Sequence, residues 1–459
     1  MRFEIQDFRR FHNPNHAEIA PLTVLVGENS SGKTSLLAGL RYIFQAISVG
    51  TEASFNREPF FLGSYDQIAH YRGGRYGRSS EFSISLKVDE NDISKLNPEN
   101  QGYFFTSKKN NIETSFTTIT LRFGNEQSQP ILNTVILENK YVVLKLKRGD
   151  LPNFSITRKD TNKELNVNAK GKFSFFAPAP STVNRNSLGP FFQTVQGWVF
   201  SHRFSRVEKE KISKNELDFM ELFLKAIMPT YTFADTIVYA SAPFRTKPER
   251  TYSPIEASSS AEGSHIPILL AQVKAYEKSK WNAIKTRLEF FGNQSGMFKK
   301  IDIKRLGTSN SDPFQIIVTV SKDKSNIIDV GYGISQILPL IVETMINDNA
   351  KIFIFQQPEV HLHPKAQAEL GSFFVDFALK SEKFLILESH SDYIIDRIKS
   401  ELMSRQLPLS KYLSVLFFDK DDIETNIRRI NFDNDGTPID PPENYRKFFL
   451  SESIKTMGL

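Results

Sequence analysis

The sequence predicts an α/β fold in which one sheet is completed by segments that lie far apart along the chain. Near the N-terminus, an apolar strand leads into a glycine-rich turn and then a helix. Short alternating strands follow between residues 79 and 158. Strands and helices alternate again from about residue 314 to the end. A long insertion therefore separates the two parts of the predicted sheet.

The glycine-rich turn Gly27–Thr34, GENSSGKT, is a phosphate-binding loop. Leu22–Val26 predicts the buried strand before it, and apolar residues recur at helical spacing from Leu36 to Ile47. In such a loop, backbone N–H groups hold phosphate oxygens, the lysine reaches the β- and γ-phosphates, and the hydroxyl after it binds Mg²⁺. Thr34 is thus a predicted Mg²⁺ ligand. The predicted nucleotide-binding residues are Gly27, Glu28, Asn29, Ser30, Ser31, Gly32, Lys33, Thr34 and Ser35.

The composition is that of an ordinary soluble protein. Of 459 residues, 40% are hydrophobic and 24% are charged, and no apolar stretch approaches the roughly 18 residues of a membrane span. The chain contains no cysteine, which excludes disulfides and thiolate metal sites and suits a reducing cytoplasm. The net charge of +6 is mild, so it leaves contact with nucleic acid open.

The middle of the chain predicts a β-rich part and then a helical part. The expected strands are Phe82–Val88, Thr117–Phe123, Asn133–Asn139 and Tyr141–Lys147, and residues 91–114 read as an exposed polar loop. Helical patterns cover 208–228 and 265–291. Between them, residues 238–254 are too rich in proline for regular structure.

Three motifs of the C-terminal part point to the same chemistry. VGYGISQILPLI (330–341) is a glycine-rich turn that opens a helix and presents free N–H groups to an anion. KIFIFQQPEVHLHP (351–364) is an apolar strand that ends in polar residues, and FLILESHSDYIIDRI (384–398) places His390 just after another strand. We expect strands at 352–355, 384–388 and 412–419, with helices that start near Ser335, Pro364 and Ser391.

Together these motifs resemble the ABC-type ATPase heads of the RecF/SMC/OLD group. More narrowly, they resemble its stand-alone bacterial AAA-type ATPases, with a "PExHLHP" Walker B motif and a "THSDY"-like switch. PFRTKPERTY (243–252) also resembles a "PxRxxPxRxY" element of these proteins. The resemblance covers the chain through about Gly50 and from about Val330 onward, and covers the middle only loosely.

The resemblance implies a P-loop NTPase head of the ABC type, a mixed β-sheet with flanking helices. An antiparallel β-subdomain and a short helical subdomain would be inserted into it. The expected boundaries are 1–78 for the N-terminal part of the head, 79–200 for the β-rich insertion, 201–300 for the helical insertion and 301–459 for the C-terminal part of the head.

The resemblance also implies the site. Such heads dimerise with two ATP molecules sandwiched between the subunits, so each P-loop faces the glycine-rich signature of its partner. The signature residues Gly331, Gly333, Ser335 and Gln336 would hold the γ-phosphate bound mainly by the other subunit, and His390 would be the switch histidine near it. Arg9 and Arg10 stand where such heads touch the nucleotide, and Gln67 is a candidate Q-loop glutamine for the Mg²⁺ site.

The Walker B motif departs from the family pattern. In the family, the strand ends in Asp or Glu, which orders Mg²⁺ through water, and a Glu or Gln follows as the candidate catalytic base, whereas this chain has the amides Gln356 and Gln357 at both positions. An amide is no general base near neutral pH and adds no charge to Mg²⁺. Glu359 would do the catalytic work, or the chain would bind ATP and hydrolyse it slowly, or one glutamine was introduced to trap the ATP state. We expect impaired turnover and intact ATP binding.

Other candidate residues predict less. His361 and His363 are expected to shape the turn after the Walker B strand rather than to bind metal. The acidic residues 419–422 lack the preceding Glu of a Toprim nuclease, so we expect no nuclease activity. The charged segment 206–214 reads as a solvated helix face. Arg245, Lys247 and Arg250 form either a phosphate contact or a salt-bridged hinge.

The expected function is that of a cytoplasmic ATPase that dimerises around ATP and regulates a DNA-directed or effector-directed process. The resemblance favours antiphage defence, or DNA repair, with a separate nuclease or toxin as effector. A non-hydrolysing scaffold, locked by nucleotide and recruiting a partner, is the alternative. A transporter motor subunit is a remote alternative, because an LSGGQ-type signature is lacking. No membrane partner is expected.

Overall fold

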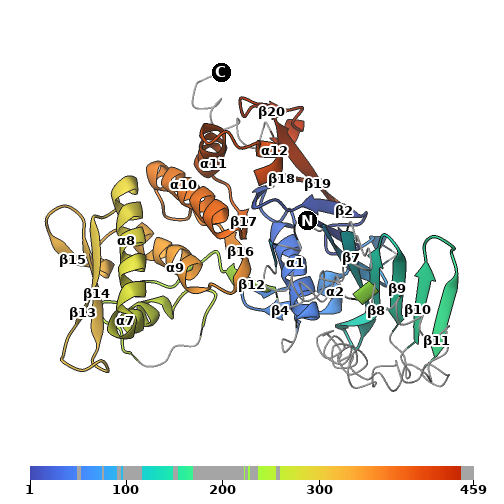
Figure 1. Ribbon diagram of the computed structural model, residues 1–459, viewed down its shortest axis with the longest axis horizontal. Coiled ribbons are helices and arrows are strands. Elements are labelled where there is room, and N and C mark those ends of the chain that lie inside the picture. Colours follow the sequence, from blue (N-terminus) through green and yellow to red (C-terminus); the bar gives the residue numbers. More distant parts are fainter. Residues whose placement is uncertain are drawn as a thin grey trace, which may run out of the picture. The chain divides into compact units, whose positions relative to one another are not determined.

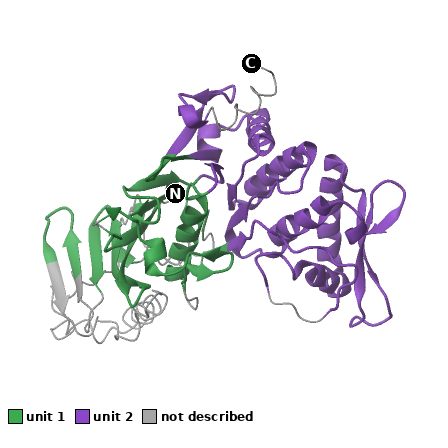
Figure 2. Ribbon diagram, turned by 180° about the vertical axis from the view of Figure 1, so that it is seen from behind, with its two compact units in different colours: residues 1–19, 30–238, 418–427 green, residues 20–29, 239–417, 428–459 purple. Residues whose placement is uncertain are grey.

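The computed structural model describes residues 1–48, 53–74, 77–89, 116–147, 153–168, 236–254 and 259–445, together with a few isolated positions. The chain divides into two compact units (Figure 2). Unit 1 consists of residues 1–19, 30–238 and 418–427, and unit 2 of residues 20–29, 239–417 and 428–459. Among the described residues, no helix has the length and apolar character needed to cross a membrane.

Unit 1 contains an antiparallel sheet of eight strands in the order β11-β10-β9-β8-β7-β6-β1-β2 (Figure 1). The strands are β1 (Arg2–Gln6), β2 (Asn15–Glu18), β6 (Phe82–Asp89), β7 (Phe116–Glu126), β8 (Gln129–Asn139), β9 (Val142–Lys147), β10 (Asn153–Arg158) and β11 (Glu164–Asn168). Because β1 pairs directly with β6, the β-rich segment continues the sheet of the N-terminal strands.

Helix α1 (Lys33–Ile47) packs against this sheet through aromatic side chains. The ring of Tyr42 lies 3.9 Å from that of Phe55 and 5.3 Å from that of Phe123, measured between centroids. Phe82 of β6 stacks on Phe123 at 4.8 Å. Such ring contacts bury large apolar surfaces and fix the helix on the sheet. The remaining regular elements of unit 1 are β4 (Asn56–Arg57), β5 (Phe60–Phe61) and α2 (Tyr65–Ile68).

The second large sheet has seven strands in the order β12-β16-β17-β3-β18-β19-β20, and β16, β17 and β3 run parallel. Its strands are β3 (Leu22–Gly27), β12 (Ile237–Ser241), β16 (Ala350–Gln356), β17 (Phe384–Glu388), β18 (Leu413–Lys420), β19 (Thr425–Phe432) and β20 (Pro438–Ile439). The helices of unit 2 are α7 (Ile266–Tyr276), α8 (Lys278–Ser295), α9 (Tyr332–Ile346), α10 (Pro364–Ser381), α11 (Asp392–Ser404) and α12 (Leu409–Tyr412).

The core of unit 2 follows the two-residue period of its strands. Alternate residues of β3, β16 and β17 pack into one cluster with α9, α10 and α11, among them Val24, Phe355 and Leu387. A small antiparallel sheet of β13 (Lys300–Arg305), β14 (Phe314–Thr319) and β15 (Lys324–Asn326) joins the same core.

Most elements that the sequence predicts are confirmed. The P-loop strand and helix, four strands between 82 and 147 and the C-terminal strands all form, although the signature helix begins at Tyr332 rather than near Ser335. Two expectations are wrong. The segment 238–254 opens with strand β12 rather than being irregular throughout, and the pattern 265–291 is two helices that meet at Glu277. The loop 91–114 and the segments 206–214 and 208–228 lie almost entirely outside the described residues.

Candidate functional site

The backbone of the P-loop has the conformation that its sequence predicts. Strand β3 is completely buried and ends at Gly27, and α1 begins at Lys33. Gly32 has φ +99°, and a Cβ there would lie 2.6 Å from the ring of Phe11, so only glycine fits. Lys33 is 3% exposed. A tight turn that opens a helix after a buried parallel strand is the backbone that phosphate binding requires.

Three parallel strands end in register beside this loop. Gln356 of β16 is paired with Glu388 of β17, and Glu388 is paired with Leu25 of β3. The Walker B end, the segment that carries His390 and the start of the P-loop therefore leave the sheet at one edge. Ligands of parallel α/β sheets bind at this carboxyl edge.

The side chain of Gln356 joins β16 to its neighbour β12. The residue is 3% exposed, and its Nε2 donates a hydrogen bond to the carbonyl oxygen of Ser241 at 3.0 Å. The backbone carbonyl oxygen of Gln356 accepts a hydrogen bond from Nη2 of Arg245 at 3.0 Å. The amide thus has a structural use that a carboxylate could not serve, because a carboxylate cannot donate. Whether Gln356 also contacts Mg²⁺ stays a prediction.

Gln357 is placed differently. It is half-buried and has φ +44°, and its backbone N–H donates to the carbonyl oxygen of Glu388 at 2.7 Å. The backbone turns sharply at this point, just beyond the end of β16. This contact involves only the main chain of Gln357, and the catalytic role expected of its side chain stays a prediction.

Both carboxylate oxygens of Glu359 accept hydrogen bonds from the segment 389–391, which carries His390 and is called the switch segment below. Oε1 accepts from the backbone N–H of His390 at 2.7 Å, and Oε2 accepts from Oγ of Ser389 at 3.0 Å. Burial raises the pKa of Glu359, while these hydrogen bonds and the nearby Arg245 oppose the rise. With both oxygens engaged, the geometry suits an anchor for the segment 389–390 better than a general base.

The switch segment is also fixed on its far side. Ser391 caps α11 by accepting from the N–H of Ile394 at 3.2 Å, and its Oγ donates to Oε1 of Gln367 at 2.6 Å. His390 therefore stands between two anchored serines.

The signature residues open α9. Gly331 is its N-cap, and a Cβ on Gly333 would lie 2.7 Å from the carbonyl oxygen of His361, so the helix packs tightly on the turn after β16. Oγ of Ser335 donates to the carbonyl oxygen of Tyr332 at 2.7 Å, and Gln336 is 2% exposed. The predicted contact of these residues with a nucleotide on another copy stays a prediction.

Arg9, Arg10 and Gln67 make contacts within unit 1. Arg9 donates to the carbonyl oxygen of Leu62 at 2.9 Å, and burial lowers the pKa of its guanidinium. Arg10 donates to the carbonyl oxygen of Asp421. Oε1 of Gln67 accepts from the N–H of Ser64 at 2.9 Å, as part of a capping box on α2. The nucleotide and Mg²⁺ contacts expected of these three residues stay predictions.

The remaining polar candidates have local structural uses. His363 caps α10, with Nδ1 accepting from the N–H of Ala366 at 3.3 Å, as expected for a turn residue. Oδ1 of Asp421 accepts from the N–H groups of Ile423 and Glu424. Within the described part of the chain, no group of three or more His, Asp or Glu side chains could hold a metal ion.

The two arginines of the 243–252 element, Arg245 and Arg250, differ in burial and in their partners. Arg250 is exposed and forms an ion pair with Asp329, with donor–acceptor distances of 2.9 and 2.5 Å. Arg245 is 6% exposed and donates a hydrogen bond to the backbone carbonyl oxygen of Gln356, the last residue of β16. The sequence left a phosphate contact and a salt-bridged hinge open for this loop; Arg250 forms a salt bridge, and both roles stay predictions.

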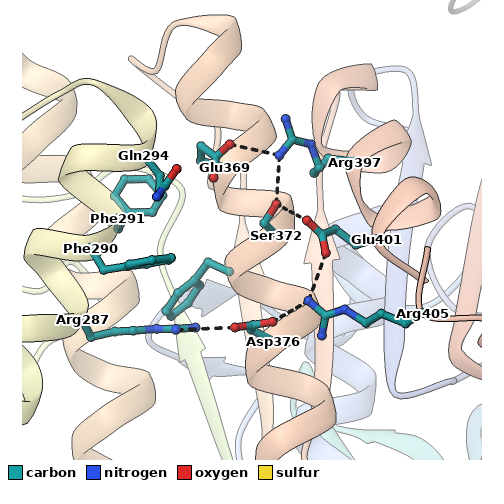
Figure 3. Close-up of a pocket in the computed structure, with 11 residues that line it drawn as sticks. Arg287, Phe290, Phe291, Gln294, Glu369, Ser372, Asp376, Arg397, Glu401 and Arg405 are labelled. Carbon is teal, nitrogen blue, oxygen red and sulfur yellow. Dashed lines mark hydrogen bonds and ion pairs between the residues drawn. The ribbon is translucent and has the colours of Figure 1, made fainter. Parts of the chain in front are cut away.

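A cleft between α8, α10 and α11 is lined by charges that satisfy one another (Figure 3). Arg397 lies 3.0 Å from Glu369, and Arg405 lies 2.6 Å from Asp376 and 3.0 Å from Glu401. The pairs with Glu369 and Asp376 tie α10 to α11, and the pair with Glu401 lies within the C-terminal end of α11. Since the carboxylates are already paired with arginine, the cleft is a structural feature rather than a second candidate site.

Sequence reasoning missed several residues that build the site. The carbonyl oxygen of Ser241 accepts a hydrogen bond from the Gln356 side chain. Ser389 and Gln367 form hydrogen bonds that hold the switch segment, and Glu388 is the buried last residue of β17. The signal for Ser389 and Glu388 was their place beside His390 at a strand end. Nothing local in the sequence indicated Ser241 or Gln367, because their partners lie far along the chain.

Comparison with known proteins gives one family. A family model described as an AAA ATPase domain matches residues 1–395. No curated protein matches the chain. The predicted α/β P-loop ATPase fold, with its inserted antiparallel strands, is confirmed by this match together with the sheet order.

Solved structures of SMC heads are similar in outline. A SmcHead bound to the C-winged helix domain of ScpA has 10% identity and a TM-score of 0.45, with 95% of this chain and 98% of that chain covered. The SMC head domain from Thermotoga maritima has 9% identity and a TM-score of 0.38, with 94% and 98% covered. A Smc head domain from Pyrococcus furiosus, with an extended coiled coil and bound to the C-terminal domain of ScpA, has 10% identity and a TM-score of 0.43, with 100% and 98% covered. Scores below 0.5 support no argument about function, so the family match alone carries the assignment.

Replacement by glutamate should destabilise the protein at Gln356 much more than at Gln357. In Gln356→Glu, a carboxylate replaces the donor to Ser241 and leaves two buried acceptors facing each other, so we expect the free energy of unfolding to fall by about 1–3 kcal/mol. Gln357→Glu changes a half-buried side chain at a turn and should cost less than about 0.5 kcal/mol. Urea unfolding of both variants measures the difference. Equal stability of the two variants would show that the Gln356 amide is not needed.

Proposed function

This chain belongs to the family of the AAA ATPase domain, and on that basis we propose that it binds ATP with Mg²⁺ and uses the bound nucleotide to control its association with other proteins. The P-loop carries this proposal. Its turn and the N-terminus of α1 offer backbone donors for phosphate oxygens, and Lys33 adds a positive charge. Bound Mg²⁺ would neutralise phosphate charge, held by the hydroxyl of Thr34 and by water.

The residues at the carboxyl edge of the sheet divide the remaining tasks. Glu359 holds the backbone of His390 and the hydroxyl of Ser389, so the switch segment has a defined position before any ligand binds. Gly333 lets α9 approach the turn after β16, which fixes the start of the signature helix. Both features supply preorganised geometry, which is what phosphoryl chemistry asks of a protein.

The nucleotide is proposed to join two copies. The start of α9 is exposed at Gly331 and Tyr332, so its N-terminal N–H groups can reach an anion carried by a second molecule. Two P-loops facing two signature helices would give a dimer that forms with ATP. A separate effector, a nuclease or a toxin, would then be held or released according to the nucleotide state, in antiphage defence or in DNA repair.

Weak turnover follows from the amides at Gln356 and Gln357, since neither accepts a proton near neutral pH. The two amides also favour a second candidate function, in which bound nucleotide holds a scaffold together and the scaffold recruits a partner without hydrolysis. The two candidates share ATP binding and differ in phosphate release.

Lys33→Ala should weaken binding of MgATP by about 10–100-fold, because it removes a charge-assisted contact with the phosphates worth about 1.5–3 kcal/mol. Titration calorimetry measures the affinity, and size-exclusion chromatography with and without ATP measures association. Lys365→Ala removes an exposed lysine and serves as the control. If Lys33→Ala keeps the parent affinity, the proposed site is wrong.

Phosphate release separates the switch from the scaffold. Glutamate at position 357 restores a candidate base, so Gln357→Glu should release phosphate about 10²–10⁴ times faster than the parent, which is the usual contribution of a general base. A malachite green assay on both proteins detects the change. No release from either protein would favour the scaffold, provided that both bind ATP.

Direct contact with DNA predicts a steep dependence on salt. If phosphates are bound, the affinity for a short duplex should fall by about tenfold or more between 50 and 200 mM salt. Fluorescence anisotropy at several salt concentrations tests this, with and without ATP. Affinity that is weak and insensitive to salt would remove DNA from the proposed partners.

A further inference from the structure

The phenyl ring of Phe11 lies directly against the P-loop. Phe11 is fully buried, and its ring atoms Cζ and Cε2 lie 2.6 and 2.8 Å from the position that a Cβ on Gly32 would occupy. Gly32 has φ +99°, and its carbonyl oxygen accepts a hydrogen bond from the N–H of Leu36 at 3.0 Å, at the start of α1. The ring thus packs on the residue at which the loop turns into the helix.

Backbone hydrogen bonds fold residues 7–12 into a tight turn, called the 7–12 turn below, that carries this ring. The N–H of Asp7 donates to the carbonyl oxygen of His12 at 3.2 Å. Phe8 and Phe11 each donate a backbone hydrogen bond to the carbonyl oxygen of the other at 2.9 Å. Asp7 and Arg9 have φ values of +53° and +51°. Such values are uncommon for residues other than glycine and cost free energy, so the surroundings must hold the turn in this form.

One carboxylate oxygen holds the base of the 7–12 turn. Oδ1 of Asp7 accepts a hydrogen bond from Oγ of Ser79 at 2.8 Å and another from Nη2 of Arg72 at 3.2 Å. Nδ1 of His12 lies 3.0 Å from the same oxygen. Hydrogen bonds to an ionised carboxylate are stronger than those between neutral groups, so the base of the turn is firmly attached to the segment 72–79.

The tip of the 7–12 turn is attached through its backbone. The N–H of Arg9 donates to the carbonyl oxygen of Ile68 at 2.6 Å, and the carbonyl oxygen of Arg9 lies 2.6 Å from Nδ1 of His70. The carbonyl oxygen of Arg10 accepts from the N–H of Thr425 at 3.0 Å. Two segments that are far apart in sequence therefore hold the tip, and with it the ring that follows, against the P-loop.

We propose that Phe11 is a positioning residue for the ATP site: its ring, held by the 7–12 turn, supports the left-handed conformation of Gly32 from which the N–H groups of the loop point at phosphate. Without the ring, a space beside Gly32 lets the loop relax, and the relaxed loop loses its preorganised donors. The proposal rests on the proposed function, because it takes the P-loop as the site that binds ATP.

The same turn supplies a matched control. Phe8 is also fully buried, but its ring packs on those of Phe55 and Phe82, at 5.7 and 5.3 Å between centroids. The three atoms nearest to the Cβ position of Gly32 all belong to Phe11. Phe8→Leu and Phe11→Leu remove the same atoms from buried sites, so each should lower the free energy of unfolding by a similar amount. Only Phe11→Leu changes the support of Gly32.

Hydrogen exchange at the amide of Leu36, in protein without nucleotide, tests the positioning role. Phe11→Leu should speed this exchange by about tenfold or more, because the carbonyl oxygen of Gly32 that accepts from Leu36 loses its fixed position. Phe8→Leu should leave the exchange rate within about threefold of the parent. Equal exchange in the two variants would overturn the proposal in favour of a general packing role.

Two further measurements address the site and the contact. In titration calorimetry, Phe11→Leu should bind MgATP about tenfold more weakly than Phe8→Leu. In urea unfolding, the methyl group of Gly32→Ala would collide with the ring, so Phe11→Leu should cost less stability in that background than in the parent. Additive losses of stability would overturn the proposal. If Gly32→Ala does not fold, the exchange and affinity of the two leucine variants decide.

The positioning role and the proposed function can fail separately. Fast exchange at Leu36 in Phe11→Leu alone, when the parent binds no MgATP, would keep the support of the P-loop by Phe11 and reject the proposed function. Equal affinity of Phe11→Leu and Phe8→Leu for MgATP, when the parent binds it, would keep the function and reject the positioning role.

Discussion

Parallel pairing of β3, β17 and β16 is the constraint on which the candidate site depends. The register places Leu25, Glu388 and Gln356 in one row, so the loop after β3 begins at the same edge as the loops after β16 and β17, which lie hundreds of residues further along the chain. Helices pack against alternate residues of these strands, among them Val24, Phe355 and Leu387, and the residues between them are almost all buried as well. The three strands therefore lie in the interior, and only the loops that follow them can present polar side chains to a ligand.

Much of this arrangement could be predicted from the sequence, because it depends on local patterns. The glycine spacing of the P-loop, the apolar strands of the C-terminal part and the turn role of His363 follow from residue types within a few positions. The break between α7 and α8 at Glu277 could not be predicted, since no proline or glycine marks it. The strand character of β12 was hidden by the prolines that follow it.

The parts of the site that sequence reasoning missed depend on contacts between distant segments. Arg245 and Gln356 are separated by 111 positions, and Gln356 and Ser241 by 115. Glu359 appeared in the sequence as the nearest remaining carboxylate and hence as a candidate base. In the structure, both of its oxygens accept hydrogen bonds from the segment 389–390, a contact between segments that no local pattern in the sequence indicates.

The amide of Gln356 has a consequence for the conditions under which the fold holds together. An amide does not titrate, so the link between β16 and β12 keeps the same donor and acceptor from acidic to alkaline solution. A carboxylate in that place would change its bonding with each proton gained or lost. The hydrogen bond that joins the outermost strand β12 to β16 therefore does not depend on pH.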